Sequence, residues 1–401
     1  MALPGDLNPA AKALAGLDEV ELTIEKLVAG GDGLARVDGV PIFVSGSVPG
    51  DRLRAEIFHR TTQYGRARIL EVLEGGPGRR TAPCPHFEIC GGCDLQQIED
   101  ELQPRLKAAA ARETLERLGR LPDLPPSTLI QGAAWGYRTR AQLRTDLVDD
   151  RVRIGYFAKS SHDLVPVVEC PVLVVELEDQ LLTLASELEP GAPRRIDLAA
   201  GDDGAVTCSP PIEGQPRGAV RREVGGITYE YDARTFFQTH PGLLRDLITA
   251  VCGSWKGQRA FDLYAGVGLF TLPLAQRYDR VTAIESDSAA ARYARRNARS
   301  NGLSNVDVHT QSLETSIQDL PASVDRVVVN PPRAGLSRRV SNMLALRRPR
   351  RVTYLSCHPA TLARDLGLLR EVYRVESLTF FDLFPQTGHL ESLVQLILAD
   401  G

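Results

Sequence analysis

Short apolar segments alternate with amphipathic segments from residue 240 to the end of the chain, and this alternation constrains the fold most strongly. The apolar segments are typical of short buried strands: RAFDLYAG, RVTAIES, NVDVHT, RVVVN and RVTYLS. The segments between them have helical composition: LFTLPLAQRY, SAAARYARRNARSNG, SRRVSNMLALRR and ATLARDLGLLREV. Strands that alternate with helices predict an α/β fold with a mostly parallel, doubly wound sheet.

A glycine-rich turn, DLYAGVG, follows the first of these strands and opens a helix. Glycine at such a turn lets the backbone pass close to a ligand. Glu285 ends the next strand, where a carboxylate can bind ribose hydroxyls. The third glycine of the dinucleotide-binding pattern is absent, because Phe270 and Thr271 fill that region. The turn therefore favours S-adenosylmethionine over a nicotinamide dinucleotide, and a turn that binds no ligand is the alternative.

Two further motifs follow predicted parallel strands, where ligands of doubly wound sheets bind. Asn330-Pro-Pro-Arg333 comes after VDRVVV, and Cys357 ends the next strand directly before a predicted helix. A helix N-terminus favours the thiolate form of a nearby cysteine. Most single cysteines are inert core residues, but the position of Cys357 beside the predicted cofactor cleft makes it a candidate nucleophile. Glu391 opens a predicted hairpin strand at the sheet edge, and alone it would be interpreted as a surface residue.

The first half of the chain has a different organisation. Residues 18–75 contain short alternating segments between glycine-rich turns, which predict a barrel of about five strands. Residues 99–120 have the composition of a helix, and residues 131–230 predict an antiparallel sheet. Arginines are frequent between residues 52 and 80: Arg52, Arg54, Arg60, Arg66, Arg68, Arg79 and Arg80. They either bind phosphate or form a solvated face, and their pattern favours neither interpretation.

The cysteines indicate a metal site. The chain has seven, and an odd number in an expected reducing compartment argues against a disulfide framework. Cys84, Cys90 and Cys93 form a C-x5-C-x2-C pattern, and Cys170 is a distant fourth thiol. Four thiolates suit either a structural zinc ion or a [4Fe–4S] cluster, and the spacing alone favours zinc somewhat.

Composition and charge exclude several classes of protein. Hydrophobic residues make up 43% and charged residues 24% of the 401 residues, as in a globular protein of two or three domains. No apolar run approaches the ~20 residues that span a bilayer, so we expect no membrane association. The segment MALPGDLNPAAKALAGL does not have the pattern of a signal peptide, and the expected location is cytoplasmic. A net charge of −4 is compatible with RNA binding, because local patches decide contacts with phosphate.

Taken together, the motifs resemble those of the RNA uridine-5-methyltransferase family, and specifically its iron–sulfur ribosomal RNA branch. The segments DLYAGVGLF, NPPRAGL, LSCHPATLARDL and HLESL occur in the family's order and at roughly its spacing. FFQ at 236–238 resembles the start of the family's catalytic domain. CPHFEICGGC, with the later Cys170-Pro171, resembles its cluster motif. Residues 18–75 resemble the TRAM domain, an RNA-binding barrel.

The resemblance implies roles for individual residues. Cys357 would be the nucleophile and Glu391 the proton acceptor. The implied cofactor contacts are Gln238, Tyr264, Gly266, Leu269, Glu285 and Asn330. The implied ligands of a [4Fe–4S] cluster are Cys84, Cys90, Cys93 and Cys170. Three residues depart from the family pattern: Asn330 stands where Asp is usual, Leu269 where Asn is frequent, and His358 where Asn is usual. A protonated His358 beside the thiol would favour thiolate.

The resemblance also implies an architecture and a reaction. We expect a TRAM or OB-like barrel at 18–75, a central iron–sulfur antiparallel β domain at 76–235 and a Rossmann-like class I methyltransferase domain at 236–401. The helix at 99–120 would pack on the catalytic domain. The implied enzyme is a monomer that uses S-adenosylmethionine to methylate carbon 5 of a uridine in a 23S ribosomal RNA loop. The alternatives are a transfer RNA uridine-5-methyltransferase, a nucleobase amino-methyltransferase acting through Asn330, and an RNA-binding protein without activity.

Overall fold

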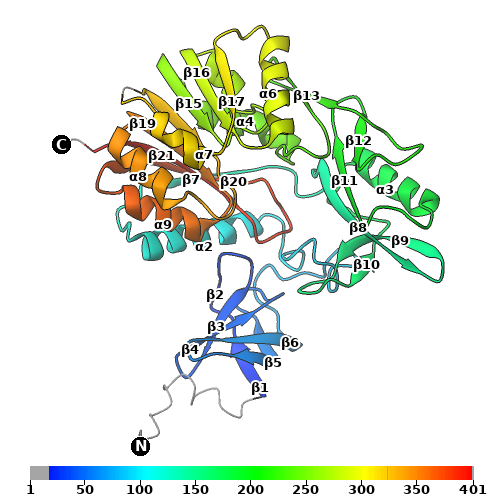
Figure 1. The fold of residues 1–401 in the computed structure, drawn as a ribbon. Helices are drawn as coiled ribbons and strands as arrows, with labels where there is room; N and C mark the ends of the chain where they lie inside the picture. The colour runs from blue at the N-terminus through cyan, green and yellow to red at the C-terminus, as the bar shows by residue number, and fades with distance from the viewer. Residues whose placement is uncertain (1–17, 323, 400–401) are drawn as a thin grey trace, which may run out of the picture. The chain divides into compact units, whose positions relative to one another are not determined.

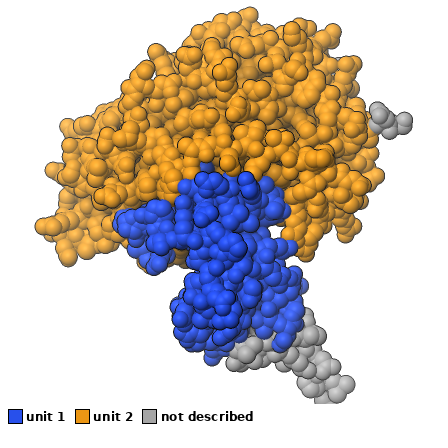
Figure 2. Space-filling view, turned by 180° about the vertical axis from the view of Figure 1, so that it is seen from behind, with its two compact units in different colours: residues 1–111, 385–389 blue, residues 112–384, 390–401 orange. Residues whose placement is uncertain are grey.

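The computed structural model describes residues 18–322 and 324–399, so the segment MALPGDLNPAAKALAGL lies outside the described residues. The chain divides into two compact units (Figures 1 and 2). Unit 1 comprises Met1–Ala111 and Pro385–His389, and unit 2 comprises Arg112–Phe384 and Leu390–Gly401. Within the described ranges, no helix has the length and apolar composition of a membrane span.

Unit 1 contains a six-stranded sheet with the order β1-β5-β6-β4-β3-β2. Its strands are β1 (Glu19–Thr23), β2 (Lys26–Leu27), β3 (Gly33–Val37), β4 (Val40–Val44), β5 (Arg52–Arg60) and β6 (Gly65–Glu74). In β5, Leu53, Ala55 and Ile57 enter the core at every second position, because successive side chains of a strand point to opposite faces. The predicted β domain is confirmed, but it has six strands instead of five. EVELTIEKLV divides into β1 and β2, and β3 forms within a segment that had the composition of a turn.

The rest of unit 1 joins segments that are far apart in the chain. The N–H groups of Asp94 and Leu95 donate to the carbonyl oxygen of Gln386 at 2.8 and 3.0 Å. The side chain of Gln103 donates from Nε2 to Oε1 of Gln386 at 2.9 Å. Residues 385–389 therefore belong to this unit, although residues 112–384 separate them from Ala111 along the chain. Helix α2 (Gln103–Gly119) begins in unit 1 and ends in unit 2.

The first part of unit 2 is an antiparallel five-stranded sheet with the order β10-β9-β8-β11-β12. Its strands are β8 (Arg140–Val148), β9 (Arg151–Phe157), β10 (Leu164–Pro166), β11 (Arg195–Ala200) and β12 (Val206–Ser209). The hairpin of β13 (Val220–Val224) and β14 (Ile227–Tyr231) follows. The antiparallel arrangement agrees with the prediction. The apolar run DLVPVVECPVLVV forms only the three residues of β10, and helix α3 (Val175–Glu187) begins at its last residue.

The second sheet of unit 2 has eight strands in the order β17-β16-β15-β18-β19-β21-β20-β7. They are β7 (Ser127–Gln131), β15 (Gly257–Leu263), β16 (Tyr278–Glu285), β17 (Val306–Thr310), β18 (Arg326–Val329), β19 (Arg351–Ser356), β20 (Tyr373–Asp382) and β21 (Glu391–Leu398). Strands β15 to β19 pair in parallel, as predicted. Strand β21 is antiparallel to both β19 and β20, so its predicted place at the sheet edge is wrong. The upstream strand β7 pairs with β20 and covers the edge that β20 would otherwise expose.

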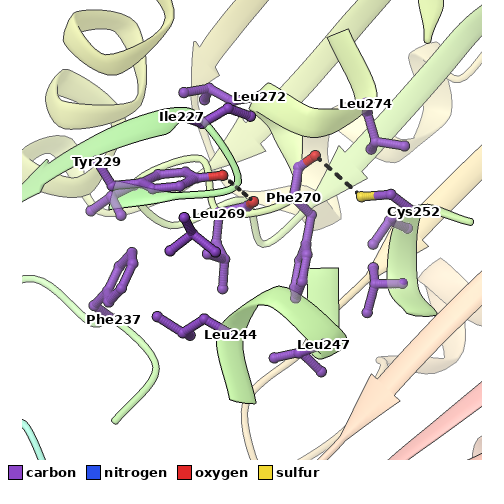
Figure 3. Packing of buried hydrophobic residues seen from close by; sticks show 14 of the residues in the cluster. Ile227, Tyr229, Phe237, Leu244, Leu247, Cys252, Leu269, Phe270, Leu272 and Leu274 are labelled. Carbon is purple, nitrogen blue, oxygen red and sulfur yellow. Dashed lines mark hydrogen bonds between the residues drawn. The ribbon is translucent and has the colours of Figure 1, made fainter. Parts of the chain in front are cut away.

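Helices connect the strands of this sheet and enclose its core. They are α4 (Leu244–Cys252), α5 (Thr271–Ala275), α6 (Ser288–Ser300), α7 (Leu313–Ser316), α8 (Arg338–Arg347) and α9 (Pro359–Leu369), with the 3-10 turns η1 (Pro241–Leu243) and η2 (Ile317–Asp319). Figure 3 shows the packing of Tyr229, Leu244 and Phe270 beside the start of α5. The Sγ atom of Cys252 donates to the carbonyl oxygen of Phe270 at 3.9 Å. This core fixes the position of the glycine-rich turn that precedes α5.

Candidate active site

Most of the predicted site residues of unit 2 follow the carboxyl ends of its parallel strands. Tyr264 follows β15, Glu285 ends β16, Asn330 follows β18 and Cys357 follows β19. Because these strands are parallel and adjacent, their carboxyl ends lie at one edge of the sheet. The topology therefore brings together residues that are separated by up to about a quarter of the chain.

The glycine-rich turn has the backbone of a ligand-binding loop. Tyr264, Gly266 and Gly268 have positive φ values of 64°, 56° and 96°. For a non-glycine residue such as Tyr264 this conformation is strained, and such strain is concentrated at functional sites. A Cβ atom on Gly266 would meet no atom within 4 Å, so open space lies in front of this turn, whereas one on Gly268 would lie 2.6 Å from Leu272. Gly268 serves packing, and Gly266 leaves the backbone accessible to a ligand.

Glu285 stabilises the same turn. Its Oε2 atom accepts the N–H of Gly266 at 2.8 Å, and its Oε1 atom accepts the N–H of Asp287 at 2.7 Å. The two hydrogen bonds fix the carboxylate beside the accessible glycine. Each oxygen retains a further lone pair with which it can accept a hydroxyl.

Gln238 and Leu269 have different surroundings. Gln238 is 2% exposed, and its Oε1 atom is buried without a hydrogen-bond partner among the described residues. An unsatisfied buried amide oxygen is unfavourable unless a ligand supplies a donor, so Gln238 fits a cofactor contact. The side chain of Leu269 packs in the core of Figure 3, and its carbonyl oxygen accepts the hydroxyl of Tyr229 at 3.1 Å. Leu269 therefore offers no side-chain hydrogen bond where the family often has Asn.

Cys357 and Glu391 lie at neighbouring ends of two antiparallel strands. Cys357 directly follows β19, Glu391 opens β21, and the residues next to them, Ser356 and Ser392, are paired. The charge of Glu391 acts on the thiol of Cys357. Glu391 is 4% exposed, and its Oε2 atom has no hydrogen-bond partner among the described residues. The sequence around Glu391, taken alone, predicted a surface residue, and that prediction is wrong. The sheet places a thiol beside a buried carboxyl group.

The electrostatics of this pair depend on burial and on Arg333. Burial raises the pKa of Glu391 to about 8, and the positive charge of Arg333 opposes this shift. Burial and the charge of Glu391 raise the pKa of the Cys357 thiol to about 11, while the charge and a hydrogen bond of Arg333 lower it. Burial of the thiol therefore opposes the stabilisation of the thiolate that is expected at the N-terminus of α9.

Arg333 is the site residue that the sequence interpretation missed. From the sequence, Arg333 is only the last residue of the Asn-Pro-Pro-Arg motif. In the structure its charge acts on both Cys357 and Glu391. Thr361 of α9 donates from Oγ1 to the carbonyl oxygen of Arg333 at 3.1 Å, which holds the loop against the helix that follows the thiol. The NPPR motif could have drawn attention to Arg333. That its charge acts on Cys357 and Glu391 becomes visible only once β19 and β21 are paired.

His358 caps helix α9. Its Nδ1 atom accepts the N–H of Thr361 at 3.3 Å. Burial lowers the pKa of His358, and the neighbouring charge of Arg333 lowers it further. The lowered pKa disfavours the imidazolium form that would stabilise the thiolate. Asn330 is half-buried, and its backbone N–H donates to the carbonyl oxygen of Leu263 at 3.4 Å.

The predicted metal ligands lie in both units. Cys84, Cys90 and Cys93 belong to unit 1, and Cys170 belongs to unit 2. The N–H of Gly92 donates to Sγ of Cys90 at 3.4 Å. None of the seven cysteines, all of which are described, forms a disulfide. Over residues 18–322 and 324–399, no three His, Cys, Asp or Glu side chains are arranged to hold a metal ion.

The arginines between residues 52 and 80 are all ion-paired. Their nearest acidic partners lie between 2.5 and 3.4 Å away: Arg52–Glu74, Arg54–Glu71, Arg60–Asp18, Arg66–Asp32, Arg68–Glu56, Arg79–Asp51 and Arg80–Asp100. Arg79 binds a fully buried carboxylate, so its role is structural. The pairs on the strands are largely exposed and contribute little to stability, so phosphate can compete for these arginines.

Comparisons with known proteins indicate the family of the chain. The family described as tRNA (Uracil-5-)-methyltransferase matches residues 221–398, and the TRAM domain matches residues 18–70. A 23S rRNA (uracil(1939)-C(5))-methyltransferase of Pectobacterium atrosepticum is 32% identical over 95% of this chain and 94% of its own length. The protein of the same name from Klebsiella pneumoniae is 32% identical over 94% of this chain and 95% of its own length.

The fold also matches a solved structure. The tRNA (uracil-54, C5)-methyltransferase of Pyrococcus abyssi, in complex with S-adenosyl-L-homocysteine, aligns with a TM-score of 0.73 and 24% identity. The alignment covers 94% of this chain and all of that one. At this identity the likeness establishes the fold, and the closer relatives establish the family. The chain belongs to the RNA uracil-5-methyltransferase family, and it is an S-adenosylmethionine-dependent enzyme that methylates carbon 5 of uracil in RNA.

Proposed function

We propose that this enzyme methylates a uridine in a loop of 23S ribosomal RNA and that Cys357 and Glu391 perform the chemistry. The observation that supports the catalytic assignment is the pairing of Ser356 with Ser392, since Cys357 follows the first of these residues and the buried Glu391 precedes the second. The names and coverage of the relatives from Pectobacterium and Klebsiella support the choice of ribosomal RNA. A loop is the favoured substrate, because the target base must leave its stack to reach such a site.

The proposed reaction begins at the thiol. Carbon 5 of uracil is a weak nucleophile until a thiolate adds to carbon 6 and converts the ring to an enolate. Cys357 forms this S–C6 bond, and Arg333 stabilises the thiolate by its charge and its hydrogen bond. S-adenosylmethionine, when bound, supplies the electrophilic methyl group that carbon 5 attacks.

Glu391 completes the proposed cycle. It accepts the proton from carbon 5, the electrons of the C5–H bond form the C5–C6 double bond, and the S–C6 bond breaks to release Cys357. A base is most effective when its pKa lies near the working pH, and the pKa of Glu391 is about 8. The deep burial of Glu391 also excludes water that would compete for the proton.

We assign the cofactor contacts to Gln238, Tyr264, Gly266, Glu285 and Asn330. The orphaned Oε1 of Gln238 and the open space before Gly266 support this assignment. The carboxylate of Glu285, held beside the turn, suits the ribose hydroxyls. Leu269 contributes shape rather than a hydrogen bond, because its side chain packs in the core.

Two other functions are possible for a protein with this fold: a different reaction and the same reaction on a different RNA. A nucleobase amino-methyltransferase acting through Asn330 would need neither Cys357 nor Glu391, and Arg333 stands where its aromatic residue would be. A transfer RNA uridine-5-methyltransferase would use all of the residues assigned above. The ribosomal assignment therefore rests on the relatives, whereas the uracil chemistry rests on the cysteine and the glutamate.

The substrate is tested by mapping 5-methyluridine in cellular RNA with and without this gene. We expect one or more 5-methyluridines of 23S RNA to be lost without the gene and restored by the wild-type protein. Transfer RNA should keep its 5-methyluridine. Loss from transfer RNA with intact ribosomal RNA would instead select the other substrate.

We further propose that Cys84, Cys90, Cys93 and Cys170 hold a [4Fe–4S] cluster. The proposed domains are an RNA-binding domain at 18–75, a cluster domain at 76–235 and a catalytic domain at 236–401. We propose that the enzyme is a cytoplasmic monomer. The family resemblance and the four thiols support the cluster. The N–H of Gly92 on the sulfur of Cys90 is a contact that stabilises cluster-bound thiolates. The described residues do not bring three such ligands together, and the proposed methyl transfer does not involve the cluster.

Anaerobically purified protein should be brown and contain iron and inorganic sulfide. Substituting Cys90→Ser should bleach it, because three thiolates hold a cluster less well than four. Cys208→Ser is the matched control and should keep the colour, since Cys208 lies buried in β12 away from the motif. Colourless wild-type protein with stoichiometric zinc would show that the cysteines hold a structural zinc ion instead of a cluster.

A further inference from the structure

A groove lies between the end of α2 and helix α9, both within unit 2 at this point. Two glycines allow the end of α2 to approach α9 closely. A Cβ atom on Gly119 would lie 3.2 Å from the carbonyl oxygen of Ala363, and one on Gly367 would lie 3.5 Å from the carbonyl oxygen of Gly119. The shallow groove has a volume of about 400 Å³. Its lining includes Leu118, Arg120, Ala360, Arg364, Gly367 and Arg370.

A second hollow of about 470 Å³ continues the groove and shares Arg120 and Arg370 with it. It adds Arg374 at the start of β20. The only acidic side chains in the two linings are Asp123 and Glu371. Four arginines against two carboxylates make this surface positive, although the formal charge of the whole chain is −4.

The arginines of the groove differ in their availability. Among the described residues, neither Arg120 nor Arg374 has an acidic side chain within ion-pair distance, and both are exposed. Arg370 lies 3.3 Å from Glu371, which is itself 82% exposed. Arg364 is held by Asp365 and by the carbonyl oxygens of Ala334 and Leu336, so its role is more structural. Arg120 and Arg374 contrast with the arginines at 52–80, each of which has a carboxylate partner.

The groove starts next to the active site. Ala360 lies in the first turn of α9, three positions after Cys357, and the lining then includes positions 364, 367 and 370. Steps of four and three residues keep these positions on one face of the helix. At about 1.5 Å per residue they extend over roughly 15 Å, which matches about four stacked nucleotides at about 3.4 Å each.

We propose that this groove binds the phosphate backbone of the single-stranded RNA that adjoins the target uridine. The inference rests on RNA as the substrate of the site around Cys357. A base that is flipped into that site leaves its neighbours in the strand near the N-terminus of α9. The guanidinium groups of Arg120, Arg370 and Arg374 would then contact successive phosphates, and Leu118 would pack against the sugars.

The test is the salt dependence of RNA affinity in the double variant Arg120→Ala/Arg374→Ala. Removing two contacts with single-stranded RNA should weaken binding about tenfold near 0.15 M salt and reduce the log–log salt slope by about 1.4. The kcat at saturating RNA and the affinity for S-adenosylmethionine should not change. The control is Arg280→Ala/Arg350→Ala, which removes the same charge from side chains that are 66% and 80% exposed elsewhere in unit 2.

Shortened substrates show which part of the RNA is bound. The loss caused by the groove variant should disappear for RNAs that lack the nucleotides on one side of the target uridine and persist for RNAs trimmed on the other side. Equal salt slopes for the groove and control variants, or a loss that persists in both trimmed RNAs, would overturn the proposal. If wild-type enzyme methylates no 23S fragment, the proposed substrate is wrong. The salt slopes of the groove and control variants are then compared on the RNA that the enzyme does methylate, and equal slopes there overturn the proposal for the groove.

Discussion

Cys357→Ala is expected to abolish methylation, with kcat falling about 10⁴-fold or more, as when other catalytic nucleophiles are removed. Without the sulfur, no bond to carbon 6 forms, and carbon 5 of uracil stays too weak a nucleophile to attack a methyl group. Binding of RNA and S-adenosylmethionine should remain within a few-fold of wild type. The measurements are methyl transfer from labelled cofactor and the affinities of the two ligands.

A substrate containing 5-fluorouridine tests the covalent step directly. Fluorine cannot leave carbon 5 as a cation, so wild-type enzyme should be trapped as an RNA adduct that is visible on a denaturing gel. The adduct should require both the cofactor and Cys357. The control Cys208→Ala should be trapped like wild type, because this buried thiol lies in the other sheet of unit 2. If active wild-type enzyme forms no adduct, the covalent mechanism is wrong and amine methylation through Asn330 becomes the leading account.

Glu391→Gln is expected to stop the reaction after methyl transfer. The amide keeps the shape of the side chain but cannot accept the proton from carbon 5. Turnover should fall about 10²- to 10⁴-fold, as for the loss of a general base. The enzyme should accumulate as a covalent complex with methylated RNA, whereas Cys357→Ala yields neither adduct nor methylated base. Normal turnover of Glu391→Gln would assign the base to another residue.

The pH dependence of stability distinguishes this effect from misfolding. The pKa of Glu391 is about 8 in the folded protein against an ordinary value of 4.5. Between these pH values the folded state binds more protons than the unfolded state, so this group makes stability fall as pH rises. Glu391→Gln lacks this effect, and it should be at least as stable as wild type at pH 8 and lose that advantage towards pH 4.5. A variant that melts far below wild type at pH 8 would indicate a structural role for Glu391.

The sequence alone determined the elements whose signals are local. The strands β15 to β19 and the helices between them follow from apolar runs and helical composition over a few residues, and the sheet contains them in parallel as predicted. The glycine-rich turn was recognisable for the same reason, because positive φ angles restrict which residues can occupy it. The order of the motifs was sufficient to indicate the family.

The boundaries of helices and strands, and the segments with weak sequence patterns, were harder to predict from the sequence. The run DLVPVVECPVLVV has the composition of a long strand but forms mainly a loop that leads into α3, since an apolar run is equally compatible with other buried structure. The segment that contains β3 is rich in glycine, and only its pairing with β2 and β4 makes it a strand.

The tertiary structure decided everything that depends on residues distant in the chain. The position of β21 between β19 and β20 turns Glu391 from an apparent surface residue into the buried neighbour of Cys357. Folding also brings Arg333 near both groups, burial raises the pKa of the thiol, and burial together with the charge of Arg333 lowers the pKa of His358. The ion pairs of the arginines at 52–80 and the available arginines beside α9 appear only after folding. Periodicity and turn chemistry act over a few residues, whereas burial, register and charge pairing arise from contacts that no local pattern specifies.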